Sequence, residues 1–271
     1  MTGAHGQLGR HVIDLATSSG IPIRGAGSAE IDITDDASVV GAVAPGSVVI
    51  NCAAYTAVDA AETDEEAATA VNGHGPEVLA RVCADVGATL IHVSTDYVFA
   101  GDATQPYPVD APTGPCSAYG RTKLLGEQAV LAALPSAHIV RTAWVYTGDG
   151  NDFVATMRRL ERDRDTVRVV DDQVGCPTYA RDLAAGLLEL ATRADFDPVP
   201  GGILHATNAG EATCTTWLVQ SSTVSAQIRN GSTRARATSS SARLRVLRTR
   251  YWTGRHGRRP VSLRSGRGGK R

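Results

Sequence analysis

The chain lacks the features that mark a metal-binding, disulfide-bonded or membrane-spanning protein. Its 271 residues include five cysteines, none of them in a Cys-x-x-Cys pair, and no two histidines have metal-ligand spacing. No run of 18 apolar residues occurs, and no charged segment followed by an apolar core opens the chain. We therefore expect a soluble, cytoplasmic protein with reduced thiols, no metal site and no membrane partner.

Acidic residues are missing from the end of the chain. All 28 lie at or before Glu211, while 14 of the 27 basic residues lie after it, which leaves a net charge of −15 before this point and +14 beyond it. Ser, Thr, Arg and Gly dominate residues 212–271, a composition that buries too little apolar surface to offset the entropy of ordering. We interpret this segment as a disordered basic tail.

The change in composition near residue 212 is abrupt, and we hypothesise that it marks a shifted reading frame. The alternative is a genuine tail that binds nucleic acid. Because the acidic body would repel a polyanion, we do not expect a nucleic-acid partner.

A glycine motif opens the chain with almost nothing before it. Gly3, Gly6 and Gly9 form Gly-x-x-Gly-x-x-Gly and lead into apolar residues at helical spacing. Such a loop lets a pyrophosphate approach the backbone at a helix N-terminus. In a Rossmann unit a central strand of about five or six residues feeds this loop, and only Met1 stands there. We therefore expect that the first strand is missing and that the true start lies upstream.

Strand and helix patterns alternate after the glycine loop. Short apolar segments occur at residues 21–24, 47–51, 89–93 and 137–146, with helical patterns between them. This alternation predicts an α/β fold with a Rossmann-like, doubly wound parallel sheet. We assign residues 1–145 to a dinucleotide-binding domain that includes the catalytic helix, and residues 146–211 to a partial substrate-binding region.

Three side chains suit proton and hydride chemistry. Thr95 ends a buried strand pattern, at the sheet edge where open α/β folds bind ligands. Tyr119 and Lys123 lie four residues apart on one face of the following helix, and a neighbouring cation favours a tyrosine phenolate. Tyr119 can then exchange a proton while Thr95 holds the same substrate oxygen. The three together predict reduction of a carbonyl, or oxidation of an alcohol, by a bound hydride donor.

The preferred cofactor is suggested by two arginines. NAD-preferring sites usually place an acidic residue at the end of the second strand, where this chain has Arg24. Arg10 follows the glycine loop, and either guanidinium could accept a 2′-phosphate. The sequence therefore favours NADPH and leaves NADH open.

Six motifs in a fixed order carry a family resemblance. They are Thr-Gly-Ala-x-Gly-Gln-Leu-Gly at 2–9, Asn-Cys-Ala-Ala-Tyr-Thr-x-Val-Asp-x-Ala-Glu at 51–62, Ser-Thr-Asp-Tyr-Val-Phe-x-Gly at 94–101, Tyr-x-x-x-Lys at 119–123, Arg-Thr-x-Trp-Val-Tyr at 141–146 and Asp-Asp-Gln-x-Gly-x-Pro-Thr at 171–178. As a set they resemble the dTDP-4-dehydrorhamnose reductases, which are extended short-chain dehydrogenase/reductases. The resemblance covers roughly residues 2–211.

The resemblance implies NAD(P)H-dependent reduction of the 4-keto group of dTDP-4-dehydro-L-rhamnose to dTDP-L-rhamnose, a precursor of cell-wall polysaccharides. By matching positions, Tyr119 donates the proton, Lys123 tunes it and holds the nicotinamide ribose, and Thr95 binds the keto oxygen. Asp96 and Trp144 line the sugar site. Besides Tyr119 and Lys123, the implied cofactor-binding residues are Gly3, Gly6, Gln7, Leu8, Gly9, Asp32, Ile33, Ala53, Ala54 and Tyr55. A magnesium ion reported for some members has no matching cluster here.

Other functions stay open at this point. The chain could be another sugar-nucleotide reductase, epimerase or dehydratase of the same family, or a non-catalytic regulatory subunit, although the intact trio of Thr95, Tyr119 and Lys123 argues against the latter. A homodimer is compatible with the sequence. If residues 212–271 replace the family's C-terminal region, part of the pocket is lost and we expect little turnover.

Overall fold

The computed structural model describes residues 1–148, 152–163, 166–170, 173–193, 201–217 and 260–264. Its central sheet has four parallel strands in the order β1-β2-β3-β8. These are β1 (Val48–Asn51), β2 (Thr89–Thr95), β3 (His138–Thr142) and β8 (Gly202–His205). The predicted parallel α/β architecture is therefore confirmed.

The strand register decides which side chains meet at the edge of the sheet. Asn51 pairs with His92 between β1 and β2, and Thr95 pairs with Thr142 between β2 and β3. Because all four strands run in the same direction, their carboxyl ends share one edge. Ligands of open parallel sheets bind at that edge.

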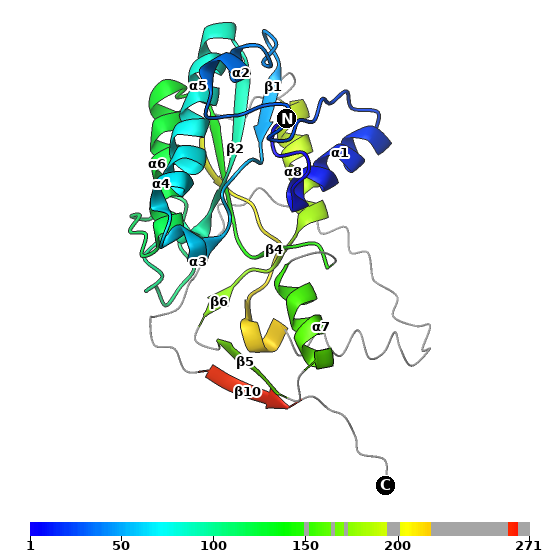
Figure 1. Ribbon diagram of the computed structural model, residues 1–271, viewed down its shortest axis with the longest axis vertical. Helices are drawn as coiled ribbons and strands as arrows, with labels where there is room; N and C mark the ends of the chain where they lie inside the picture. Colours follow the sequence, from blue (N-terminus) through cyan, green and yellow to red (C-terminus); the bar gives the residue numbers. More distant parts are fainter. Residues whose placement is uncertain (149–151, 164–165, 171–172, 194–200, 218–259, 265–271) are drawn as a thin grey trace.

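Helices cover both faces of the sheet (Figure 1). One face carries α5 (Gly75–Val86) and α6 (Ala118–Ala133), and the other carries α1 (Gln7–Ser18) and α8 (Ala180–Arg193), which pack against each other. Strands buried on both faces are expected to be apolar throughout, which explains the short β-branched runs in the sequence.

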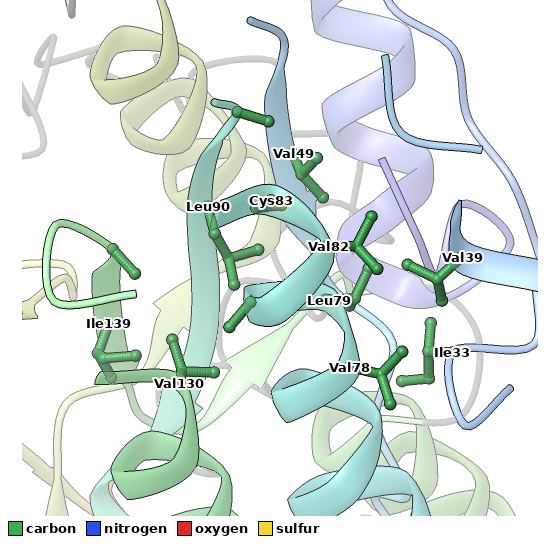
Figure 2. Packing of buried hydrophobic residues seen from close by; sticks show 13 residues of the cluster. Ile33, Val39, Val49, Val78, Leu79, Val82, Cys83, Leu90, Val130 and Ile139 are labelled. Atoms are coloured by element: carbon green, nitrogen blue, oxygen red, sulfur yellow. The ribbon is translucent and has the colours of Figure 1, made fainter. Parts of the chain in front are cut away.

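The core beneath α5 and α6 shows how this packing works. Figure 2 shows Val49 and Leu90 from the sheet facing Leu79 and Val82 of α5, with Val130 of α6 beside Ile139. Leu79, Leu90, Val130 and Ile139 have no exposed surface, and burying one such side chain stabilises the fold by about 1.5–3 kcal/mol. This packing fixes α6, the helix that carries Tyr119 and Lys123.

Smaller helices connect the main elements on this face. They are α2 (Asp36–Val40), α3 (Val58–Ala61), α4 (Glu65–Thr69), the π-helical turn η1 (Ala70–His74) and the 3₁₀ turn η2 (Asp96–Val98). The π turn lies directly between α4 and α5. Its Asn72 hydrogen-bonds both backbone groups of Tyr55 and the hydroxyl of Thr122 on α6.

The first residues occupy the position of a central strand without forming one. Thr2 makes single parallel bridges to Ala26 on one side and to Asn51 on the other. Its backbone N–H donates to the carbonyl of Ile50 at 3.0 Å, and the N–H of Ala26 donates to the carbonyl of Met1 at 3.0 Å. At this place the described residues form two single-residue bridges rather than a strand of ordinary length.

The remaining elements gather below the carboxyl edge of the sheet (Figure 1). They are α7 (Phe153–Asp163) and three strand pairs: β4 (Val145–Tyr146) with β7 (Thr178–Tyr179), β6 (Val174–Gly175) with β9 (Ala212–Thr213), and β5 (Thr166–Val170) with β10 (Pro260–Arg264). No helix in the described part of the chain is long and apolar enough to cross a membrane.

The composition of residues 212–271 predicts no regular structure. Within that segment the structure forms β9, a helical turn at residues 214–217, and β10. Residues 218–259 and 265–271, which hold most of the predicted basic tail, lie outside the described residues.

Candidate active site

A pocket of about 720 Å³ lies at the carboxyl edge of the sheet, between the start of α1 and the start of α6. A volume of this size is in the range of ligand and cofactor sites. It brings together most of the predicted site residues, which come from distant parts of the chain. These are Gly6, Gln7, Leu8, Gly9, Ala54, Thr95, Asp96, Tyr119, Lys123 and Trp144.

The other predicted cofactor residues do not line this pocket. Ile33 is 5% exposed and packs in the core against α5, while Asp32 is exposed and accepts hydrogen bonds from the backbone and hydroxyl of Thr34. Ala53 donates its N–H to the side chain of Asn51 at 3.0 Å. Tyr55 packs in the small cluster that also contains Tyr119.

The glycine loop is shaped by two close backbone approaches. Gly3 has a φ of +69°, and a side chain there would meet the backbone N of Ala53 at 2.6 Å. A side chain on Gly9 would meet the carbonyl oxygen of Gly3 at 2.1 Å. Only glycine fits these positions, so the loop folds tightly against the end of β1.

The N-terminus of α1 suits an anion. Gly6 caps the helix without any side-chain hydrogen bond to the first turn, and the first turn contains no acidic residue. Free N–H groups and the helix dipole at such a terminus attract phosphate groups. The residues present therefore fit the pyrophosphate of a dinucleotide.

Thr95 is held by its own turn. Its hydroxyl donates to Oδ1 of Asp96 at 3.1 Å and accepts from the backbone N–H of Tyr97 at 3.2 Å, which caps η2. Tyr119 lines the same pocket, and the Thr95 side chain is one of the groups that influence the pKa of its phenol. The structure thus places the two predicted catalytic hydroxyls in one pocket.

Tyr119 begins α6, whose N-terminus is capped by Ser117. Its ring meets the ring of Tyr97 edge-on, with centroids 5.5 Å apart. Burial raises the pKa of Tyr119, and the charge of Asp96 adds to this effect, while the hydrogen bond from Thr95 acts against it. The pKa of Tyr119 is therefore raised rather than brought down as the sequence predicts, because burial is the largest influence on it. A phenol that keeps its proton suits a proton donor.

Asp96 faces the same pocket. It is 1% exposed, and its Oδ2 has no hydrogen-bond partner among the described residues. Burial raises the pKa of this carboxyl to about 7. A buried acceptor without a partner is costly, so Oδ2 is a natural partner for a ligand hydroxyl.

Lys123 is fully enclosed at the base of the pocket, with 1% of its surface exposed. Its Nζ donates to the carbonyl of Val93 at 2.9 Å and lies 3.2 Å from Nε2 of His92. Burial lowers the pKa of Lys123 to about 8, and the charges of Glu127 and Cys52 act against this shift.

A buried ion pair braces α6 against the sheet. Arg141 on β3 contacts Glu127 through Nη2 at 2.6 Å and through Nε at 2.9 Å, and both side chains are 2% exposed. The hydroxyl of Ser94 donates to Glu127 at 2.6 Å. Sequence reasoning missed this pair, although Glu127 follows Tyr119 by eight residues on the same face of the helix.

Trp144 forms the opposite rim of the pocket in an unusual conformation. Its φ is 47°, in the left-handed region that a bulky residue rarely adopts. The ring lies over Gly175, where a side chain would come within 2.5 Å of it, and stacks near Trp217 with centroids 5.8 Å apart. Strain of this kind concentrates at functional sites. Trp217 was missed because it follows the predicted domain boundary at residue 212.

The two predicted phosphate-binding arginines differ in position. Arg10 lines the pocket and Arg24 does not. Sequence reasoning missed Glu30, whose carboxylate accepts a hydrogen bond from the N–H of Gly27 at 2.7 Å and lies 3.8 Å from His5.

Among the described residues, no group of three His, Cys, Asp or Glu side chains could hold a metal ion.

Comparison with known proteins agrees with this geometry. A family model described as the RmlD substrate binding domain matches residues 1–250. The dTDP-4-dehydrorhamnose reductase of Mycolicibacterium smegmatis is 56% identical over 214 residues, which cover 78% of this chain and 64% of that protein. This chain therefore spans a little under two thirds of that relative's length.

Solved structures give the same result. A dTDP-4-dehydrorhamnose reductase from Clostridium acetobutylicum is 39% identical with a TM-score of 0.77, over 83% of this chain and 79% of that one. One from Bacillus anthracis, in complex with NADP, is 34% identical with a TM-score of 0.75, over 84% and 79%. The chain belongs to the dTDP-4-dehydrorhamnose reductase family.

Proposed function

We propose that this chain reduces the 4-keto group of dTDP-4-dehydro-L-rhamnose to an alcohol, giving dTDP-L-rhamnose, with NADPH or NADH as cofactor. The observation that carries the proposal is that Thr95, Tyr119 and Lys123 line one pocket together with Asp96. The family membership supplies the substrate, and the NADP complex of the Bacillus anthracis relative supports the cofactor.

The cofactor-binding half of the pocket follows from the glycine loop. The N–H groups that begin α1 would hold the pyrophosphate, and Gly3 and Gly9 let the loop fold tightly against its own backbone and the end of β1. Arg10, on the same side, would face a 2′-phosphate. The bound dinucleotide supplies a hydride to the keto carbon.

The chain's own residues would then hold the keto oxygen and supply its proton. As the keto oxygen gains negative charge, the Thr95 hydroxyl holds it by a hydrogen bond and the Tyr119 hydroxyl transfers its proton to it. The O–H bond of Tyr119 breaks and the O–H bond of the new alcohol forms. Oδ2 of Asp96 would accept a hydrogen bond from a sugar hydroxyl, and Trp144 would pack against the sugar ring.

The test is a direct assay with product identification. The full chain is incubated with dTDP-4-dehydro-L-rhamnose and either NADPH or NADH, and the products are separated and weighed by mass spectrometry. A product heavier by two hydrogens, with matching cofactor oxidation, supports the proposal. An unchanged substrate mass, with the protein shown to be folded, overturns it.

Three narrower statements belong with this proposal. A different 4-keto deoxysugar nucleotide is the second candidate substrate. The pocket residues in this proposal contact the keto group and one hydroxyl of the sugar, not the whole sugar. The same assay with other 4-keto deoxysugar nucleotides would separate them. We also propose that the protein works in the cytoplasm. We propose further that it forms a homodimer, and analytical sedimentation would test this oligomeric state.

A further inference from the structure

Trp217 lies at the centre of a group of aromatic rings next to the pocket. Its indole stacks on Phe153 with ring centroids 5.0 Å apart and on Trp144 with centroids 5.8 Å apart. It also meets the ring of Tyr146 edge-on at 5.2 Å. Of these four residues, all of which the structure describes, Trp144 alone lines the pocket. Trp217 therefore supports the pocket wall from behind without reaching the pocket itself.

Trp144 depends on its neighbours for its position. Its left-handed φ of 47° is costly for a bulky residue and persists only where the surrounding structure enforces it. The backbone is held by the N–H of Thr178, which donates to the carbonyl of Trp144 at 3.1 Å. The indole occupies space that Gly175 leaves free, since a side chain there would come within 2.5 Å of its Cε2. Gly175 and Trp217 thus fix the place of the indole from two different segments.

These two segments are the partners of one strand pair. Gly175 pairs with Ala212 between β6 and β9, and Trp217 ends the helical turn that directly follows β9. Thr213 begins that turn, because its hydroxyl accepts the backbone N–H of Thr216 at 3.0 Å. The pairing of β6 with β9 therefore brings both contacts of the indole together.

Trp217 also contacts the start of α7. Phe153 is the first residue of this helix, and its ring plane lies 14° from that of Trp217. The preceding residue, Asp152, lines the pocket and accepts the N–H of Ala155 at 2.8 Å. Trp217 thus connects two parts of the pocket wall, the Trp144 side and the Asp152 side.

We propose that Trp217 is a positioning residue for substrate binding, which holds the indole of Trp144 against Gly175 and so sets how far that indole reaches into the pocket. Aromatic side chains that line a binding site are effective only when their rotamers are locked by packing from behind. Trp217 supplies that packing without touching the substrate. This inference rests on the proposed function, because the sugar of that substrate is the group that Trp144 contacts there.

The inference gives the start of the basic segment a role in the site. Trp217 belongs to residues 212–271, whose composition predicts a tail separate from the folded body. Through β9 and the helical turn at residues 214–217, this segment instead supports the wall of the pocket.

Tryptophan fluorescence shows whether Trp217 orders Trp144 when no ligand is present. The chain contains three tryptophans, so Trp252→Phe combined with a substitution of Trp217 leaves Trp144 as the only one. Trp217→Phe keeps a ring for stacking, whereas Trp217→Leu keeps an apolar side chain without a ring. We expect the anisotropy decay of Trp144 to show an ordered ring in the Phe variant and fast local motion in the Leu variant. Equal order in both overturns the inference.

Binding of the sugar nucleotide should separate the two variants in the same way. The probe is dTDP-L-rhamnose, the proposed product, titrated calorimetrically into the full chain. Trp217→Leu should weaken its binding by about threefold to tenfold, the range of one aromatic contact, and Trp217→Phe should restore most of the affinity. KM should rise in the Leu variant while kcat stays within about threefold of wild type. A merely structural role would also weaken NADPH binding, which we expect to be unchanged.

A second background tests whether Trp217 acts through Trp144. In a Trp144→Leu background the positioned ring is gone, so Trp217→Leu should weaken dTDP-L-rhamnose binding no further. An equal loss in both backgrounds means that Trp217 acts by another route, and this result overturns the inference.

A measurement without a change at position 217 covers the case in which Trp217→Leu does not fold. Two stacked indoles couple their electronic transitions and give a couplet in the far-ultraviolet circular dichroism spectrum, which Trp252→Phe should keep and Trp144→Phe should remove. Saturating dTDP-L-rhamnose should leave this couplet in place, because Trp217 keeps its contact with Trp144 in the complex. Loss of the couplet on binding overturns the inference.

Failure of this inference and failure of the proposed function give different results. If the protein neither reduces the 4-keto substrate nor binds dTDP-L-rhamnose, the proposed function fails, and the anisotropy decay still decides whether Trp217 orders Trp144. If dTDP-L-rhamnose forms but the Leu and Phe variants bind it equally well, only the present inference fails.

Discussion

The α6 side of the pocket and the glycine-loop side are held in place by different kinds of contact. The helix that carries Tyr119 and Lys123 is held by the buried ion pair of Glu127 with Arg141. It is also held by the hydrogen bond that Asn72 donates to α6. The glycine loop is supported by the single-residue bridges of Thr2, in the place where a central strand would stand. We infer that the geometry of the proposed catalytic residues is strongly fixed, while the proposed cofactor site depends on a few backbone contacts.

The largest expected effect is on chemistry at the α6 side. Tyr119→Phe should lower turnover by about 10²–10⁴-fold, because no other group named here donates a proton to the developing alcohol. Binding of NADPH, measured by fluorescence titration, should stay nearly unchanged. Turnover within a few fold of wild type would remove Tyr119 from the role. Tyr97→Phe is the matched control, since its ring touches Tyr119 but its hydroxyl has no place in the proposed chemistry.

The bracing of α6 should show in stability. Arg141→Met leaves Glu127 as a buried charge without its partner, which costs about 3–5 kcal/mol. Urea unfolding followed by circular dichroism measures the loss. Arg121→Met breaks the solvent-exposed pair between Arg121 on α6 and Glu65 on α4, and this variant should change stability little. Equal losses in the two variants would contradict the contrast between buried and exposed pairs.

The buried carboxyl of Asp96 should make stability depend on pH. Its pKa is near 3.9 in the unfolded chain and about 7 in the folded one, so the folded state binds the proton more tightly. Its contribution is therefore intact below pH ~4, is lost as the pH rises toward 7, and stays lost above that. Asp96→Asn should be more stable than wild type by a few kcal/mol at pH 8 and nearly equal at pH 4, in urea unfolding at both values. An equal difference at the two pH values would exclude the buried carboxyl as the cause.

The smallest of these effects is expected on the glycine-loop side. In Gly9→Ala the new methyl group meets the backbone of Gly3, so the loop must shift and NADPH binding should weaken by about tenfold or more. Calorimetric titration measures the affinity for NADPH. The control is Gly41→Ala, where the nearest atom to a new methyl group is 3.7 Å away and binding should not change. Turnover at saturating cofactor should fall less than binding, and the reverse would break the comparison between the two sides.

Much of the site could be predicted from local patterns. A strand that ends at Thr95 and a helix that presents Tyr119 and Lys123 are encoded within short stretches, and the parallel sheet brings them to one edge. The contact of Asn51 with His92, and that of His92 with Lys123, could not be predicted from the sequence. They depend on the register between β1 and β2. The left-handed conformation of Trp144 also has no local signal in the sequence.

The second limit on predicting the site from the sequence was the environment of each side chain. Ile33 and Asp32 match a cofactor motif by position, yet one packs in the core and the other lies in an exposed turn. The pKa of Tyr119 was predicted in the wrong direction, because sequence spacing shows the neighbouring lysine but not the depth of burial.

The π-helical turn η1 amounts to one extra residue inserted between α4 and α5. Because the insertion is absorbed within a single wide turn, the helices on either side keep their own phase and bury the same faces. What the insertion adds is the position of Asn72, whose carbonyl lies where any side chain on Gly126 would come within 2.1 Å. The extra residue and the glycine facing it are therefore structurally coupled, because a side chain at position 126 fits only if the carbonyl of Asn72 moves away.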